Sequence, residues 1–235
     1  MIKNIFKVIG IFVIGMVGGI FADQIFWPYF VERPLFLKYH LESTPLYGVQ
    51  IKEIYIQENT ALKDAVEKVE KAVVGIRAVT PSEIQEGSGL IVTSDGLVVT
   101  LAKLLPKGSK ITLFLGEEKI SPQVLQIKDG LALLKIDKEN LPTLAFADYE
   151  KLKPGERVFL VGTVFKKGTP RKTINEGVIK YLDEQGIHTN IFEKKTLAGS
   201  TLFDIQGNIL GLNMIDQEGK IITIPVLEIK NFLGL

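Results

Sequence analysis

The stretch "TLAGSTLFDIQGNILGLN" (196–213) shows the local pattern from which the fold of this chain is predicted. Two short apolar runs flank a turn at Gly207 and Asn208, and this arrangement is typical of a β-hairpin. A cluster of small residues, 198–201, precedes the first run, at a place where many hydrolases carry a nucleophile. The stretch therefore raises two questions: which β fold contains the hairpin, and whether the small residues perform chemistry.

Short apolar segments of this kind continue from residue 73 almost to the end of the chain. Turn signals such as Ser94-Asp95-Gly96 and Pro154-Gly155-Glu156 separate them, and no helical repeat lies between them. This pattern predicts an all-β barrel or sandwich. Helices are expected at its two ends, in residues 59–72, where apolar residues recur at helical spacing, and in residues 226–235.

The composition excludes several classes of function. The chain has 235 residues, of which 28 are basic and 27 acidic. This balance and the lack of a basic stripe argue against nucleic acid as a partner. The chain has no cysteine, which excludes disulfides, thiolate metal sites and a cysteine nucleophile. Its two histidines, His40 and His188, stand in no metal-binding spacing, so we expect no metal and no cofactor.

The N-terminal segment predicts a membrane anchor across residues 1–30. Lys3 and Lys7 precede an uncharged apolar run that ends at Ala22, and aromatic residues suited to a membrane interface follow. The positive-inside rule places the lysines in the cytoplasm and the following domain outside it, at the cell membrane. The alternative is a cleaved signal peptide that ends at Ala22. Residues 31–58 are predicted to form an extended stalk.

Five ordered segments carry a longer pattern. They are "EGSGLIVTSDGLVVTLAKLL" (86–105), "LALLKIDKENLPTLAFADYEKLKPGERVFLVGTVF" (131–165), "EGVIKYL" (176–182), "IHTNIFEKKTLAGSTLFDIQGNILGLN" (187–213) and "IITIPVLEIKNFL" (221–233). Together they resemble the HtrA/Deg-type, trypsin-like serine proteases, and the resemblance covers residues 60–235.

This resemblance implies an all-β domain at 59–235, a trypsin-like double six-stranded antiparallel β-barrel preceded by the N-terminal transmembrane helix and a short helix. The first barrel is expected at 73–147 and the second at 155–225, with a cleft between them. A C-terminal helix is expected at 226–235, and no PDZ domain is expected.

The same resemblance gives one position for each member of the family's catalytic triad. Lys103 stands at the histidine position, Gly130 at the aspartate position and Ala198 at the serine position. A methyl group cannot attack a carbonyl, a glycine orients nothing, and a lysine stays protonated at neutral pH unless it is desolvated. Thr196 also replaces the first glycine of the family's oxyanion loop. The resemblance therefore implies a vestigial, catalytically inactive cleft.

Two alternatives place chemistry or charge elsewhere. Ser200 lies two residues beyond the old serine position and, with Lys103, is the candidate nucleophile of a displaced site. Asp129 is a candidate shifted acid, although a turn cap is the simpler interpretation. Basic residues at 166–167, 171–172 and 194–195 are predicted to be solvated loop charges, and the alternative is a surface for an anionic partner.

These observations predict a membrane-anchored, extracytoplasmic pseudoprotease that binds a peptide or an envelope protein in the cleft between the barrels. One alternative is a serine-type endopeptidase that uses Ser200 and Lys103. The other is a structural assembly subunit that packs as a homo-oligomer or against an active homologue. A fold alone does not decide among them.

Overall fold

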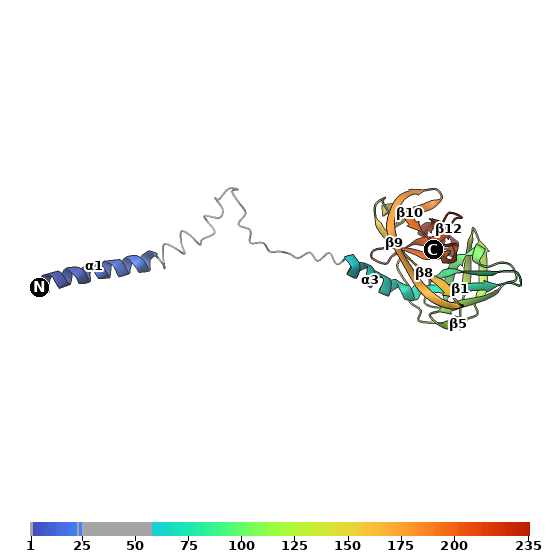
Figure 1. The fold of residues 1–235 in the computed structure, drawn as a ribbon, viewed down its shortest axis with the longest axis horizontal. Helices are drawn as coiled ribbons and strands as arrows, with labels where there is room; N and C mark the ends of the chain where they lie inside the picture. The colour runs from blue at the N-terminus through green and yellow to red at the C-terminus, as the bar shows by residue number, and fades with distance from the viewer. Residues whose placement is uncertain (1, 23, 25–57) are drawn as a thin grey trace. The chain divides into compact units, whose positions relative to one another are not determined.

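The computed structural model describes residues 2–22, 24 and 58–235 (Figure 1). The chain divides after residue 56 into two units, which are described separately. His40 and the predicted stalk, apart from Glu58, lie outside the described residues.

The N-terminal unit contains α1 (Ile2–Phe21), a helix of 20 residues. An 18-residue window within its stretch from Lys3 to Phe21 has a mean hydropathy of 2.0, and the side chains of the stretch are exposed. A helix of this length rises about 30 Å, which matches the hydrocarbon thickness of a bilayer. By length and composition α1 is therefore able to span a membrane, and the choice between anchor and signal peptide stays a prediction.

The second unit begins with α3 (Glu58–Val69), which continues as the short 3-10 helix η2 (Glu70–Ala72). Leu62, Ala65 and Val69 recur along one face and pack against the main core. Next to Val69, Lys68 Nζ donates to the Gln206 carbonyl at 2.8 Å. The helix expected from the apolar spacing is confirmed, and it ends where the β-branched run begins.

The first half of the domain is a seven-stranded antiparallel sheet. Its strands are β1 (Val73–Val79), β2 (Ile84–Ile91), β3 (Leu97–Leu101), β4 (Lys110–Leu115), β5 (Glu118–Ile120), β6 (Gln123–Lys128) and β7 (Leu131–Lys135). They pair in the order β5-β4-β1-β2-β3-β7-β6. This half therefore has one strand more than the expected six. Among residues 58–235, the end strands β5 and β6 do not pair with each other, so the sheet does not close through hydrogen bonds.

The second half closes as the resemblance implied. It contains β8 (Arg157–Lys166), β9 (Thr169–Asp183), β10 (Gly186–Phe192), β11 (Thr201–Asp204), β12 (Ile209–Ile215) and β13 (Lys220–Pro225). These six strands form a closed barrel in the order β10-β13-β12-β11-β8-β9. The helix α4 (Val226–Leu233) follows and ends at Gly234, whose left-handed backbone is the usual helix terminator. The trypsin-like all-β fold is confirmed.

The hairpin predicted in residues 196–213 is formed by β11 and β12. The Asp204 side chain accepts hydrogen bonds from the backbone N–H of Gln206 and Asn208, at 2.9 and 2.8 Å, and Gly207 adopts a positive φ of 83°. A short acid and a glycine are suited to such a turn because one accepts backbone N–H groups and the other lacks a Cβ. The hairpin predicted from the sequence is therefore confirmed with its turn chemistry.

One hydrophobic core joins the two halves. It contains Val99 and Leu101 from the first sheet and the stacked rings of Phe159 and Phe203 from the barrel, whose centroids lie 5.5 Å apart. Separate cores fill the first sheet and the barrel. Because the joining core lies between the halves, their packing decides the geometry of the cleft at its edge.

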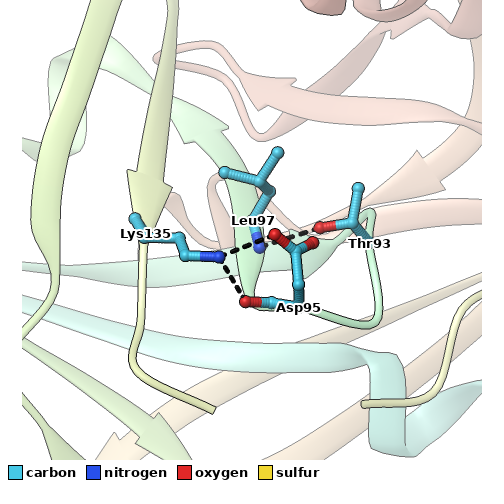
Figure 2. Close-up of polar contacts among 4 residues, drawn as sticks. All are labelled: Thr93, Asp95, Leu97 and Lys135. Carbon is cyan, nitrogen blue, oxygen red and sulfur yellow. Dashed lines mark hydrogen bonds and ion pairs between the residues drawn. The ribbon is translucent and has the colours of Figure 1, made fainter. Parts of the chain in front are cut away.

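A polar cluster ties the β2–β3 turn to the end of β7 (Figure 2). Lys135 Nζ donates to Asp95 Oδ2 at 2.7 Å, and the Leu97 N–H donates to Thr93 Oγ1 at 3.0 Å. The hydrogen bond from Lys135, followed by the one from Thr93, holds the pKa of Asp95 below its usual value. Leu97 pairs with Lys135, so the cluster fixes one end of the β3–β7 ladder, whose other end leads into the cleft.

Lys172 was expected to be a solvated loop charge, but it lies on the strand β9. Its side chain is half-buried beside the first sheet, and Nζ donates to the Val73 carbonyl. Burial lowers the pKa of Lys172 to about 8, although the charge of Glu70 acts in the opposite direction. The folded chain therefore releases this proton at a lower pH than the unfolded chain does.

We expect the stability of the fold to depend on pH through Lys172. Between pH 8 and 10.5 the unfolded chain binds more protons at this group than the folded chain, so Lys172 contributes a free energy of unfolding that rises with pH. The free energy of unfolding of Lys172→Met minus that of wild type should therefore be largest near pH 7.5. This difference should fall by up to about 3 kcal/mol by pH 10.5. Urea unfolding of the full chain in detergent measures the difference.

The matched control is Lys180→Met, because Lys180 is an exposed lysine of the same strand. Its difference from wild type should not change with pH in this window. An equal pH dependence for the two variants would contradict the assignment to Lys172.

Candidate functional site

A cavity of about 310 Å³ lies between the two halves of the domain. Gln85, Lys103 and Leu104 line it from the first half, and Lys195, Ala198 and Ile215 line it from the second. The structure thus brings together two of the three predicted triad positions, Lys103 and Ala198, although 95 residues separate them in the sequence. We refer to this cavity as the cleft pocket.

The β3–β7 ladder positions Lys103 and Gly130. β3 ends at Leu101, and the short 3-10 helix η3 (Ala102–Leu104) follows it and carries Lys103. The Ala102 N–H donates to the Gly130 carbonyl at 2.8 Å, so the third triad position lies next to the backbone that bears Lys103. Gly130 has a positive φ of 78° with no heavy atom within 4 Å of the place where a Cβ would lie, which fits a turn residue that supports no side-chain chemistry.

The loop that carries Ala198 is wound into the 3-10 helix η5 (Lys195–Leu197). Its backbone donors bind within the loop: the Leu197 N–H donates to the Lys194 carbonyl at 2.9 Å, and the Ala198 N–H donates to the Lys195 carbonyl at 3.0 Å. An oxyanion hole needs N–H groups that point at the position where negative charge develops. In this conformation the Ala198 N–H is already engaged elsewhere.

Ser200 does not line the cleft pocket. It is fully buried, and its Oγ accepts a hydrogen bond from Asn213 Nδ2 at 3.0 Å. Asn213 Oδ1 in turn accepts one from Thr223 Oγ1 at 2.6 Å, and all three side chains are inaccessible to solvent. A Cβ at Gly162 would lie 2.8 Å from the Ser200 Cβ, so Ser200 faces the barrel strand β8 and not the cavity.

Ser88 on β2 holds the cleft loop against the first sheet. Its N–H donates to the Ala198 carbonyl at 2.9 Å, its Oγ accepts from the Thr163 N–H at 2.8 Å, and its carbonyl accepts from Thr100 Oγ1 at 2.7 Å. Gly199 approaches so closely that a Cβ would lie 2.2 Å from the Ser88 carbonyl oxygen. This buried residue therefore links the first sheet to both β8 and the cleft loop.

The charges at the cleft pocket are predominantly positive. Lys103 and Lys195 both line it, and burial, followed by repulsion from Lys195, lowers the pKa of Lys103. Asp216 also lines it, but its Oδ1 accepts the backbone N–H groups of Glu218 and Lys220 at 2.8 and 2.9 Å. Within residues 58–235, neither Lys103 nor Lys195 forms an ion pair.

The remaining sequence candidates lie outside the cleft pocket. Asp129 is an exposed residue with a positive φ of 51° and contacts its neighbour Lys128 at 3.4 Å. His188 Nε2 lies 2.9 Å from Asp183 Oδ1, and its ring stacks on Tyr181. The part of the chain that the structure describes contains no group of three acidic or histidine side chains that could hold a metal ion.

Comparison with known proteins decides the family. The sequence profile of the trypsin-like peptidase domain matches residues 87–212. The chain belongs to the HtrA/Deg-type trypsin-like peptidases. The DegP-like probable periplasmic serine endoprotease of Pseudomonas putida F1 is 31% identical to this HtrA-like chain over 140 residues, which cover 54% of the chain and 28% of the relative.

Two further comparisons extend over more of the HtrA-like domain. The serine protease HTRA1A of Danio rerio is 28% identical over 199 residues, which cover 74% of this chain and 40% of that protein. A solved structure of the HtrA-type protease AlgW with a tripeptide has a TM-score of 0.65 at 23% identity, and the match covers 74% of this chain and 62% of that one. The serine endoprotease of Yersinia pestis gives the same TM-score at 21% identity, with 74% and 65% covered. These two structures show the fold alone.

The chain spans between 28% and 40% of the length of the two curated relatives described above.

Sequence reasoning missed several residues of the cleft pocket. Lys195 is predicted to be a solvated loop charge, with a surface for an anionic partner as the alternative, and Gln85, Ile215 and Gln217 are not singled out. Nothing local in the sequence marks Gln85, which enters the pocket through pairing of distant strands.

We expect Ser88→Ala to lower the free energy of unfolding by about 1–3 kcal/mol, because the buried Thr163 N–H loses its acceptor. Chemical unfolding of the full chain measures this. Ser94→Ala is the matched control, since Ser94 is exposed in the β2–β3 turn, and it should change stability by less than about 0.5 kcal/mol. Equal small effects of the two substitutions would contradict the role of Ser88 as the link between the halves.

Proposed function

We propose that the protein is a membrane-anchored, extracytoplasmic pseudoprotease whose cleft binds extended peptide segments without hydrolysing them. The observation that carries the proposal is the lining of the cleft pocket, where Lys103 and Ala198 lie together. The resemblance gives these two positions to the family's histidine and serine, and neither an ammonium nor a methyl group can do the work of those side chains.

The replaced groups argue against hydrolysis by arithmetic as well as by chemistry. Removing a triad leaves a residual acceleration of about 10³- to 10⁴-fold over water, and this remaining acceleration depends on oxyanion stabilisation and binding. Here the Ala198 N–H donates to the Lys195 carbonyl, so the oxyanion contribution is weakened too. We therefore infer that cleavage in this cleft is too slow to be a function.

The displaced serine site is the weaker interpretation. A nucleophile has to lie within hydrogen-bond reach of its base and within about 3 to 3.5 Å of the carbonyl that it attacks. Ser200 is inaccessible to solvent and bound to Asn213, whereas Lys103 lines the cavity from the other half of the domain. Ser200 would have to leave its buried hydrogen-bond chain before it could meet a substrate.

The binding part of the proposal rests on an uncovered edge of β12. The Asn213 N–H donates to the Ser200 carbonyl at 2.8 Å, and the Gly199 N–H donates to the Asn213 carbonyl at 2.9 Å. Because main-chain groups of alternate strand residues point to the same side, those of Ile215 face the cleft pocket. Within residues 58–235 no strand pairs with β12 there, so an extended peptide has free main-chain partners.

The location follows from α1 and from the relatives. α1 is apolar and long enough to cross a bilayer, and Lys3 and Lys7 at its start favour the cytoplasmic side. The DegP-like relatives of Halomonas elongata and Pseudomonas putida are described as periplasmic. These observations support an anchored domain outside the cytoplasm, where an envelope protein is the available partner class.

The proposal is tested on the full chain, immobilised in detergent and exposed to a pool of random decapeptides, half with a free C-terminal carboxylate and half with a carboxamide. We expect a subset of peptides to be retained and none to acquire a new terminus, as read by mass spectrometry. A retained peptide is then resynthesised with single N-methylated amides. Methylation in one register should weaken binding about tenfold by removing one main-chain hydrogen bond, and methylation in the other should not.

The controls separate binding from catalysis. An active HtrA-type protease in the same pool should produce new termini. Cleavage by this chain that disappears in Ser200→Ala would show the displaced protease instead. Absence of any retained peptide, or equal effects of the two methylation registers, would contradict the peptide-binding cleft.

A further inference from the structure

The cleft pocket contains two lysines where the family's site has its catalytic histidine and the adjacent loop. Lys103 reaches it from η3 and Lys195 from η5, so the two positive charges come from opposite halves of the domain. They are close enough for the charge of Lys195 to lower the pKa of Lys103. Two like charges held on one small cavity repel each other, and an anion between them would relieve that repulsion.

The protein does not neutralise this pair from its own described residues. Asp216 is the acidic side chain among the residues that line the pocket, and its Oδ1 is occupied by the Glu218 and Lys220 N–H groups of the β12–β13 turn. Lys103 and Lys195 form no ion pair within residues 58–235, whereas other lysines of the domain do, such as Lys135 with Asp95. Two lysines and one aspartate therefore line the cleft pocket, which leaves its lining with an excess of positive charge.

Two N–H groups of the loop that carries Ala198 are already engaged within that loop. The N–H groups of Leu197 and Ala198 donate to carbonyls of their own loop. An anion in the pocket would therefore take its hydrogen bonds from the two ammonium groups, each of which offers up to three N–H donors. Such hydrogen bonds between oppositely charged groups are about twice as strong as neutral ones.

Three of the remaining lining residues suit the carbon chain of a peptide, and Gln85, Asp216 and Gln217 add polar groups. Leu104 and Ile215 are buried apolar side chains, and Ala198 contributes a methyl group where the family has a hydroxyl. The volume of about 310 Å³ lies at the small end of the range for ligand pockets. Apolar walls with a positively charged end fit a residue that carries one carboxylate.

We propose that the cleft pocket binds a carboxylate of the peptide ligand between Lys103 and Lys195. The carboxylate is either the C-terminal α-carboxylate or the side chain of an aspartate or glutamate. This inference rests on the proposed function, because it assigns a chemical class to the ligand of the same cleft. In this proposal the ammonium group of Lys103 binds an anion, at the position where the resemblance places a histidine that transfers a proton.

The decapeptide pool tests this proposal through its two halves. We expect the free-acid half to be retained about tenfold more than the carboxamide half if the C-terminus is bound, at low ionic strength. If a side chain is bound instead, the two halves are retained equally and the retained peptides are enriched about tenfold in aspartate and glutamate. Either preference should weaken as salt is added, because the pocket is open to solvent.

The variants Lys103→Gln and Lys195→Gln should each remove most of the carboxylate preference, read as the ratio of free-acid to carboxamide retention or as the enrichment in acidic residues. Both side chains are exposed enough for glutamine to be accommodated without unfolding. Lys107→Gln and Lys194→Gln are matched controls, since these exposed neighbours do not line the cleft pocket, and they should keep the preference.

Three outcomes overturn the inference in distinguishable ways. Retention of peptides with no preference for the free acid and no enrichment of acidic residues would contradict the carboxylate site and leave the peptide-binding cleft standing. Loss of the preference in all four variants alike would assign it to the general charge of the surface and contradict the pocket. Absence of any retained peptide would contradict both proposals.

Discussion

The hydrogen bonds of Ser88 are the constraint on which the rest of the domain depends. One buried serine of β2 binds the cleft loop through its N–H, β8 through its hydroxyl and Thr100 of β3 through its carbonyl. Apolar packing also joins the two halves of the domain, and it is strong but does not specify direction. Ser88 adds direction, and Gly199 allows the loop to come close enough for the contact.

This junction explains how the shape of the cleft is held independently of the side chains at positions 103 and 198. Lys103 and Ala198 meet because η3 follows β3 and because Ser88 holds the Ala198 carbonyl, and neither condition requires a catalytic side chain at position 103 or 198. The shape of the cavity and the reactivity of its side chains therefore depend on different residues. A cavity of this kind is suited to binding under the proposed function, since affinity needs complementarity and not a nucleophile.

The sequence predicted the local elements well because their signals are local. The β11–β12 hairpin and α3 follow from apolar spacing and turn residues, and the resemblance placed Lys103 and Ala198 on one cleft. The open seven-stranded sheet was not predicted, because strand closure depends on curvature and pairing of distant segments. Lys172 was expected to be solvated, and the structure half-buries it because the β8–β9 hairpin lies against the first sheet. Lys195 was likewise expected to be a solvated loop charge, because only the tertiary fold brings it to the cleft pocket.

The central claim is that the cleft contains no reactive serine. Its most direct test is incubation of the full chain in detergent with a serine-directed fluorophosphonate, followed by mass spectrometry of every serine-containing peptide, with an active HtrA-type protease as the positive control. The account predicts labelling of the control and of no serine in this chain, because Ser200 is buried and hydrogen-bonded and Ala198 has no hydroxyl. Stoichiometric labelling of Ser200 would contradict it.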